Sequence, residues 1–171
     1  MKFAGWDMVI FEGKSEKPVY LSIENDKAEL RDASHLWGTS TWQTEETIKK
    51  EMQDPQVRIS SIGKAGENGV LYACIVNDLH RAAGRSGVGT VMGSKNLKAV
   101  AIRGTKGVAG VDNMAEFAKV TMEKKKILAE NAVTGEGLSA YGTQVLLYVI
   151  SEMGAVPTCN HKTVRFETAG D

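Results

Sequence analysis

Apolar and polar positions in the first third of the chain follow the pattern of β-strands. A short apolar run at residues 8–11 ends at Gly13. Two further strand-like runs, residues 19–23 and 28–31, flank the pair Asn25-Asp26. Asparagine and aspartate favour tight turns between antiparallel strands, so we predict a β-hairpin here.

The pattern changes to that of an amphipathic helix at residues 42–52, where apolar residues recur at helical spacing among charged ones. Ser40 and Gln43 can form a capping box at its start. Asp54-Pro55 stops the helix. We therefore predict a helix between strands, which indicates a layered mixed domain.

Apolar runs predict further strands after this helix. Residues 57–62 and 97–102 are strand-like, and residues 70–76 fit a strand or a helix, with β-branched residues favouring the strand. Residues 88–92 are interrupted by glycine and predict one or two helical turns. The amino terminus of those turns lies at Arg85-Ser86-Gly87.

The pattern of apolar and polar residues becomes helical after Gly107. Asp112 can cap a helix over residues 113–131, and a second helix is predicted over residues 143–153. We predict an α+β fold with mixed β-sheet layers and short helices in residues 1–107. An all-α segment, residues 108–171, follows as the start of a helical domain.

Composition is that of an ordinary globular protein, with 42% hydrophobic and 25% charged residues. No apolar run approaches the roughly 20 residues that span a bilayer, and the amino terminus lacks the apolar region of a signal peptide. We therefore expect a cytoplasmic chain with no membrane span. Cys74 and Cys159 form no Cys-x-x-Cys motif and the histidines show no ligand spacing, so this stretch predicts no zinc site or iron–sulfur cluster of its own.

Charge is balanced overall, with 21 basic and 21 acidic residues, but it is unevenly distributed. Residues 79–111 contain no aspartate or glutamate. The basic residues of this segment are Arg81, Arg85, Lys95, Lys98, Arg103 and Lys106. A segment of one sign and this length predicts an anion-binding site, with a solvated basic face as the alternative.

The chemistry of residues 77–96 favours the anion site. Glycine lets the backbone approach a ligand closely, free amides at a helix start bind anions, and arginine forks suit phosphate oxygens. The residues that fit this chemistry are Gly84, Gly87, Gly89, Gly93, Ala82, Ala83, Arg81 and Arg85. We predict a glycine-rich, basic cradle for a phosphate-bearing cofactor.

Three other interpretations, two for nucleotides and one for nucleic acid, fit less well. Gly87-x-Gly89-x-x-x-Gly93 has one residue too many for a dinucleotide fingerprint, and no Gly-Lys-Ser/Thr sequence is present for a phosphate-binding loop. A nucleic-acid module would place aromatic side chains among the arginines and lysines, but none occurs between Cys74 and Phe117. We therefore expect no nucleic-acid partner.

Longer motifs point to a known family. They are Gly66-Glu67-Asn68, Asn77-Asp78, His80-Arg81-Ala82-Ala83-Gly84-Arg85 and the run from Gly87-Val88-Gly89-Thr90 to Lys95-Asn96-Leu97-Lys98-Ala99. Together they strongly resemble the tungsten-containing aldehyde:ferredoxin oxidoreductases. The resemblance begins at Lys2-Phe3-Ala4-Gly5-Trp6-Asp7 and continues into the helical tail, so it covers essentially the whole chain.

The resemblance implies that residues 1–107 are the second part of an amino-terminal domain that supports a tungsten bis-pterin cofactor (tungstopterin). Arg81 would approach the cofactor, and the backbone carbonyl of Ala82 would help hold the magnesium ion between the two pterin phosphates. The expected cofactor-binding residues are Asn77, Asp78, His80, Arg81, Ala82, Ala83, Gly84, Arg85, Gly87 and Gly89. No catalytic acid or base is predicted in this segment.

The implied activity is the oxidation of an aldehyde to a carboxylic acid. Electrons would pass through a [4Fe–4S] cluster, whose ligands lie outside this chain, to ferredoxin or another acceptor. The expected partners are the aldehyde, a ferredoxin-like protein or subunit and the remaining parts of the same enzyme, which we expect to be an oligomer. Further pterin contacts are expected from a segment that precedes residue 1, so we predict that residues 1–171 alone are inactive. A related tungsten enzyme that reduces aromatic acyl thioesters is the alternative.

Overall fold

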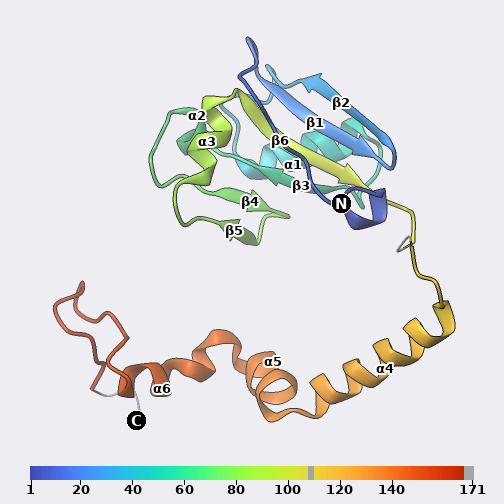
Figure 1. Ribbon diagram of the computed structural model, residues 1–171. Coiled ribbons are helices and arrows are strands. Elements are labelled where there is room, and N and C mark those ends of the chain that lie inside the picture. The colour runs from blue at the N-terminus through green and yellow to red at the C-terminus, as the bar shows by residue number, and fades with distance from the viewer. Residues whose placement is uncertain (108–109, 168–171) are drawn as a thin grey trace. The chain divides into compact units, whose positions relative to one another are not determined.

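The computed structural model describes residues 1–107 and 110–167. It divides the chain into two compact units, Met1–Gly110 and Val111–Asp171. Among the described residues, the first unit holds a six-stranded mixed sheet with short helices, and the second is helical (Figure 1). This arrangement confirms the predicted α+β class.

The elements of the first unit alternate between short helices and strands. In chain order they are the 3₁₀-helix η1 (Lys2–Ala4), β1 (Val19–Glu24), β2 (Lys27–Asp32), α1 (Thr41–Glu51), β3 (Arg58–Ser61), α2 (Lys64–Glu67), β4 (Ile75–Asn77), β5 (Arg81–Ala83), α3 (Val88–Ser94) and β6 (Leu97–Arg103).

The strands form one sheet in the order β2-β1-β6-β3-β4-β5. β1 and β6 are parallel, and the other neighbouring pairs are antiparallel. The predicted hairpin is confirmed, because β1 and β2 pair on either side of Asn25-Asp26. β5 ends the sheet, so its outer edge has no strand partner among the residues that the structure describes.

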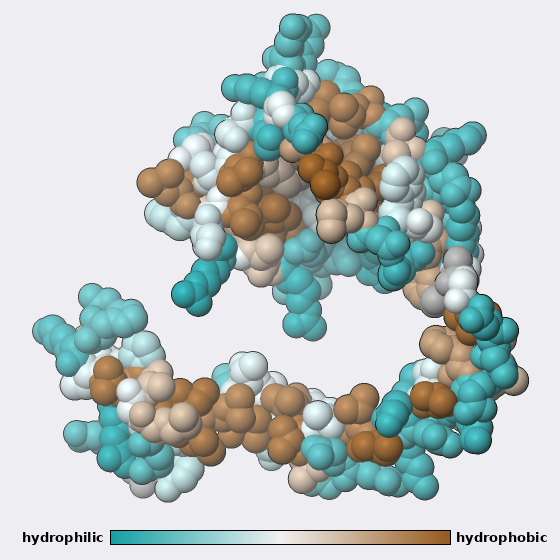
Figure 2. Space-filling view, in the orientation of Figure 1, coloured by the Kyte–Doolittle hydropathy of each residue, from teal (hydrophilic) through white to brown (hydrophobic). Residues whose placement is uncertain are grey.

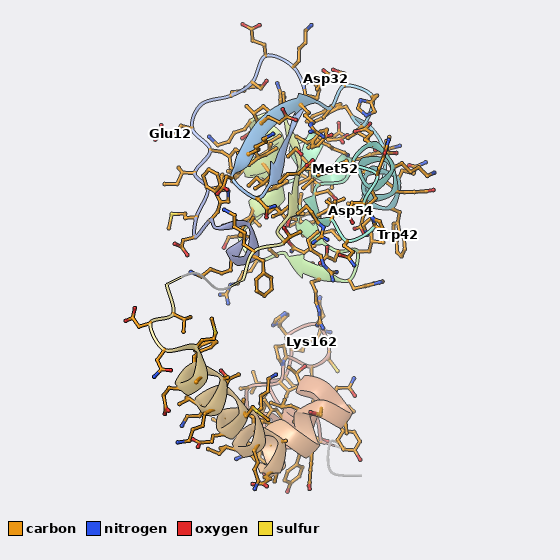
Figure 3. All side chains as sticks on the ribbon, turned by 90° about the vertical axis from the view of Figure 1, so that its right-hand side faces the viewer. Glu12, Asp32, Trp42, Met52, Asp54 and Lys162 are labelled. Atoms are coloured by element: carbon orange, nitrogen blue, oxygen red, sulfur yellow. The ribbon has the colours of Figure 1, made fainter. Side chains whose placement is uncertain are left out.

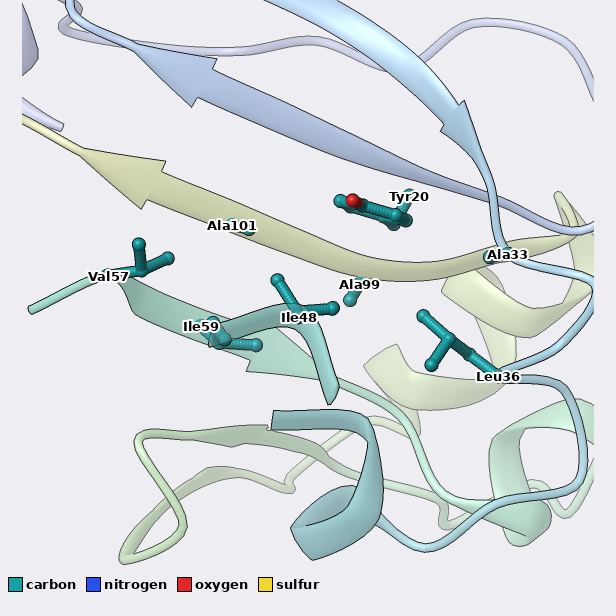
Figure 4. Close-up of a cluster of buried hydrophobic side chains, with 8 residues drawn as sticks. All are labelled: Tyr20, Ala33, Leu36, Ile48, Val57, Ile59, Ala99 and Ala101. Atoms are coloured by element: carbon teal, nitrogen blue, oxygen red, sulfur yellow. The ribbon is translucent and has the colours of Figure 1, made fainter. Parts of the chain in front are cut away.

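One face of the sheet packs against α1 and forms the main core. Tyr20, Ile48 and Ile59 are almost fully buried there, with alanines at positions 99 and 101 of β6 between them (Figure 4). The predicted capping box at Ser40 is confirmed, since its side chain accepts from the Gln43 amide and the Gln43 side chain accepts in return. This cap fixes where α1 begins.

The opposite face is covered by the amino-terminal segment and by α3. Val9 and Phe11 pack there on buried residues of β1, while Phe11 and Met92 of α3 meet Val100 of β6. In Figure 1 the amino-terminal segment runs across the near side of the sheet, on the side away from α1. The sheet is therefore covered by helix on one face and largely by extended chain on the other.

Two strand predictions are wrong in part. Residues 8–11 are extended but pair with no strand in the described parts of the chain. Within residues 70–76, strand begins only at Ile75. The Val70 amide instead donates to the Ala65 carbonyl at 3.0 Å, and Leu71 is 83% exposed in the turn after α2. An apolar run alone did not distinguish this turn from a strand.

The second unit contains helices with almost no core of their own. They are α4 (Met114–Glu130), the π-helical turn η2 (Ala132–Gly137), α5 (Leu138–Tyr141), η3 (Gly142–Leu146) and α6 (Leu147–Glu152). The cap of α4 is Asn113, whose side chain accepts from the Glu116 amide at 3.0 Å, so the predicted Asp112 cap is wrong by one residue. No helix in the described residues is long and apolar enough to cross a membrane.

Candidate cofactor-binding site

The predicted cofactor-binding residues lie on the β4–β5 hairpin and on the loop from β5 to α3. Arg81, Ala82 and Ala83 form β5 and are exposed, as is Arg85 in the loop. Asn77, Asp78 and Gly84 are half-buried, His80 is exposed, and Gly87 and Gly89 are buried. A ligand can therefore reach the arginines and alanines directly, whereas the last two glycines face the protein interior.

Asp78 holds the turn of the hairpin rather than facing outward. Its amide donates to the Ile59 carbonyl at 2.9 Å, and its Oδ1 accepts from the Ile59 amide at 3.1 Å. Asp78 and Leu79 both have positive φ, at 45° and 63°. The aspartate thus uses its backbone and side chain to tie a strained turn to β3, which sequence reasoning did not identify.

Asn77 connects the hairpin to β3 through a row of polar side chains. Its Oδ1 accepts from Ser60 Oγ at 2.5 Å, and its Nδ2 donates to the Arg81 carbonyl at 3.3 Å. Register places Ser60 opposite Asn77, and Asn77 opposite Arg81. Sequence reasoning missed Ser60, since a strand pattern does not show which residue of a distant strand lies opposite.

His80 is held from outside the hairpin by an aromatic contact. Its ring lies edge-on to that of Trp42, with 6.1 Å between the ring centroids. Trp42 stands at the surface of α1 and is 60% exposed (Figure 3). The contact fixes the turn against the first helix and suits a histidine that orients a loop.

Arg81 and Arg85 are the charged groups that remain available on the hairpin and its loop. Neither guanidinium forms an ion pair or a hydrogen bond with any residue that the structure describes. Arg81 belongs to the edge strand β5, whose outer backbone groups have no strand partner in the same part of the chain. The site therefore presents two arginine forks beside exposed peptide groups, which is a donor set suited to phosphate.

The glycines after the loop have a packing role within the protein. A Cβ on Gly87, at φ +66°, would lie 1.8 Å from the Leu71 carbonyl oxygen. On Gly93 it would lie 2.0 Å from the Gly66 oxygen, and on Gly89 2.5 Å from that of Cys74. These glycines let α3 approach neighbouring backbone, so their presence does not itself indicate a ligand. Gly84 differs, because a Cβ there meets only Cys74 Cβ at 3.8 Å.

The amides at the start of α3 are also used inside the protein. The Gly87 amide donates to the Gly84 carbonyl at 3.2 Å, that of Gly89 to Ala73 at 2.9 Å and that of Thr90 to Gly87 at 3.0 Å. For these three amides, the sequence-based expectation of free donors that could bind an anion is wrong. The donors of this segment that have no partner among the described residues include the guanidinium groups of Arg81 and Arg85, which precede α3.

Half of the predicted basic segment is neutralised by acids from elsewhere in the chain. Lys98 is fully buried and pairs with Glu67, and its Nζ donates to the Thr39 carbonyl at 3.0 Å. Burial lowers the pKa of Lys98, and the hydrogen bond that its ammonium donates to the Glu67 carboxylate offsets part of this effect. Arg103 pairs with Asp54 at 2.5 Å, and Lys106 pairs with Asp26. Residues 79–111 contain no acidic residue, but the fold brings acidic side chains from other segments against half of their basic residues. The segment therefore does not form a uniformly positive surface.

Comparison with known proteins shows where this fold belongs. A family model described as the aldehyde ferredoxin oxidoreductase N-terminal domain matches residues 1–104. The chain belongs to the aldehyde ferredoxin oxidoreductase family.

Relatives within the family match nearly the whole chain. A tungsten-containing aldehyde ferredoxin oxidoreductase of Thermococcus kodakarensis is 53% identical over 99% of this chain and 28% of its own length. The protein of the same name in Pyrococcus furiosus is 52% identical over 95% of this chain and 27% of its own length. The chain thus spans little more than a quarter of the curated relatives that it matches.

A solved structure shares the fold at similar identity. It is the active site complex BamBC of benzoyl coenzyme A reductase in complex with 1,5-dienoyl-CoA, at a TM-score of 0.65 and 47% identity. The match covers 76% of this chain and 20% of that chain. The fold described above therefore occurs in at least one solved enzyme whose name indicates a different reaction.

Proposed function

We propose that the chain is the cofactor-binding portion of a tungsten-dependent aldehyde oxidoreductase. The observation that carries the proposal is the pair of exposed arginines, Arg81 and Arg85, on an edge strand and its loop, in a chain about half identical to enzymes of that name. Phosphate groups need delocalised, forked cations that no carboxylate already neutralises. Arg81 and Arg85 meet that condition, whereas Lys98, Arg103 and Lys106 do not.

The residues present fit a pterin phosphate and its magnesium ion. Magnesium prefers oxygen ligands and keeps several waters, so a backbone carbonyl and phosphate oxygens form a suitable set. Ala82 pairs with Val76 of β4 and is the middle residue of the exposed edge strand β5. We propose that its carbonyl binds the magnesium ion, with Asn77, Ala83 and Gly84 shaping the same wall.

The protein's own groups supply position and charge. When bound, the tungsten bis-pterin would accept the two electrons of the oxidation. Arg81 and Arg85 would bind and orient the phosphates, while Asp78 and His80 would hold the turn through Ile59 and Trp42. Gly87 and Gly89 would set the position of the loop through their close packing. None of these residues is assigned a proton-transfer step.

The whole enzyme would convert an aldehyde and water to a carboxylic acid, two protons and two electrons. We propose that the electrons leave through a [4Fe–4S] cluster held by residues outside this chain, to a ferredoxin-like acceptor. Within the described residues, no group of His, Cys, Asp and Glu is arranged to hold a metal. Electron transfer would therefore depend on the remaining parts of the enzyme.

Elemental analysis of the native enzyme that contains this chain tests the proposal. We expect about one tungsten and about four irons per subunit, together with aldehyde-dependent reduction of ferredoxin. A cofactor-replete preparation without tungsten or molybdenum would overturn it. The isolated 171-residue chain is the control. Turnover of an aldehyde by that chain would contradict the proposal that activity depends on the remaining parts of the enzyme.

A second candidate function is supported by the benzoyl coenzyme A reductase structure of the same fold. In that case the cofactor would be the same and the enzyme would reduce an aromatic acyl thioester. Assaying the native enzyme with aldehydes and with benzoyl-CoA separates the two. Benzoyl-CoA reduction without aldehyde oxidation would replace the first proposal while leaving the cofactor site unchanged.

A further inference from the structure

Residues 8–11, which precede the exposed Glu12, have the side-chain pattern of a strand that is buried on both faces. Val9 and Phe11 point inward and pack on the sheet. Met8 and Ile10 point the other way and are 70% and 73% exposed. A strand with one face in water normally alternates apolar with polar residues, whereas a run that is apolar on both faces is typical of a strand covered from both sides.

The backbone of this segment has no partner in the structure. No hydrogen bond joins the peptide groups of residues 8–12 to any other described residue, although the chain is anchored at both ends. Trp6 Nε1 donates to the Asn25 carbonyl at 2.7 Å, and the Ser15 amide donates to the Lys95 carbonyl at 3.1 Å. The segment is therefore held extended across the sheet while its backbone N–H and C=O groups remain unpaired, as they are at an open strand edge.

An apolar groove lies beside the segment. It has a volume of about 570 Å³ and is bordered by Met8 and Ile10, by Ile75 of β4 and by Val88 and Val91 of α3. Figure 2 shows hydrophobic side chains gathered on this side of the first unit. An exposed apolar groove next to unpaired backbone marks an interaction site more often than a free surface.

We propose that residues 8–12 are a β-strand that pairs with an extended apolar segment supplied by the rest of the same enzyme. The choice of occupant comes from length, because the chain spans only 28% of the relative it matches over 99% of its own residues. Most of such an enzyme lies outside residues 1–171 and is available to cover the groove. Strand addition would fill the ladder and bury Met8 and Ile10 in one step.

The groove shares Asn77 and Ala83 with the proposed cofactor site, but this proposal concerns the backbone of residues 8–12 and can fail separately. Hydrogen exchange, measured by mass spectrometry, is compared between the native enzyme that contains this chain and the isolated 171-residue chain. Amides of residues 8–12 should exchange at least about 100-fold more slowly in the native enzyme, while those of the turn at Asn25-Asp26 change little. Equal exchange in the two states would overturn the proposal.

Two matched variants make the same test at the side chains. Ile10→Lys places a charge where the proposed strand docks, and Leu71→Lys places one at another exposed apolar residue, 83% accessible. Both should leave the melting temperature of the isolated chain unchanged, and Ile10→Lys alone should raise exchange at residues 8–12 in the native enzyme by about 10-fold. Protection that appears in the isolated chain and grows with its concentration would assign the groove to a second copy and overturn the proposed occupant.

Discussion

Individual residues of the segment 77–89 divide into those that face outward and those that pack. Arg81 and Arg85 are exposed and without partners in the described structure, whereas Gly87 and Gly89 are pressed against backbone. Sequence reasoning identified both groups, the arginines because they suit phosphate oxygens and the glycines because they let the backbone approach a ligand closely. It could not separate their roles, because the backbone that excludes a side chain at Gly87 belongs to Leu71, in a turn that the pattern did not predict.

Removing either exposed arginine should weaken cofactor retention. Arg81→Gln and Arg85→Gln each lose a charge-assisted contact, which corresponds to about 1.5–3 kcal/mol and hence at least about a 10-fold loss in affinity. Tungsten per subunit, measured on the native enzyme after dialysis, should fall in both variants. Lys27→Gln is the control, since Lys27 is an exposed base on β2, at the opposite edge of the sheet from β5. An equal loss in the control would remove the special role of Arg81 and Arg85.

Alanine scanning of two glycines should separate packing from ligand access. Gly87→Ala puts a methyl group 1.8 Å from a carbonyl oxygen at a positive φ, so it should destabilise the fold by more than about 2 kcal/mol. Gly84→Ala meets only ordinary contact and should stay within about 1 kcal/mol of the parent. Urea denaturation of the isolated chain measures both. A stable Gly87→Ala variant would show that the α3 packing is not as described.

Whole elements were predictable wherever local chemistry decides them. The β1–β2 hairpin and the α1 cap depend on residues close in sequence, and both predictions are confirmed. The predictions that failed concern segments whose structure depends on residues distant in sequence. Residues 8–12 have strand chemistry without a strand beside them, and the basic segment loses half its charge to acids between Asp26 and Glu67. Neither pairing can be inferred from the periodicity of one segment.

Breaking the buried ion pair that joins β6 to α2 should strongly destabilise this part of the sheet. Lys98 and Glu67 have side chains that are 0% and 3% exposed, and Glu67 also accepts from the Gly38 amide at 2.9 Å. Lys98→Met leaves a carboxylate buried without its cation and should cost about 3–5 kcal/mol. The double variant Lys98→Met/Glu67→Gln should recover part of that loss, as measured by thermal unfolding. A double variant as unstable as the sum of both single variants would contradict this account.

At the scale of the molecule the two units differ in how much they bury. The first unit contains three clusters of buried apolar residues. In the second, Ser151 is the residue that is buried among those described, and large apolar residues of α4 such as Phe117, Ile127 and Leu128 are 47–56% exposed. The hydrophobic pattern did not predict this contrast, because α4 has the amphipathic pattern of a helix that packs on a core.

The isolated 171-residue chain should therefore lose its second unit to protease much faster than its first. A helix of 17 residues without tertiary packing is marginal in water, so trypsin should cut α4 at Lys124-Lys125-Lys126. The first unit should resist, because the lysine and arginine residues of its core strand β6 are held in ion pairs and in the sheet.

In the native enzyme the lysines of α4 should be protected at least about 10-fold, as α4 gains packing partners. Limited proteolysis followed by mass spectrometry checks both states. Equal resistance of the two units in the isolated chain would mean that the helical unit is stable without the rest of the enzyme, and the apolar face of α4 would then need another explanation.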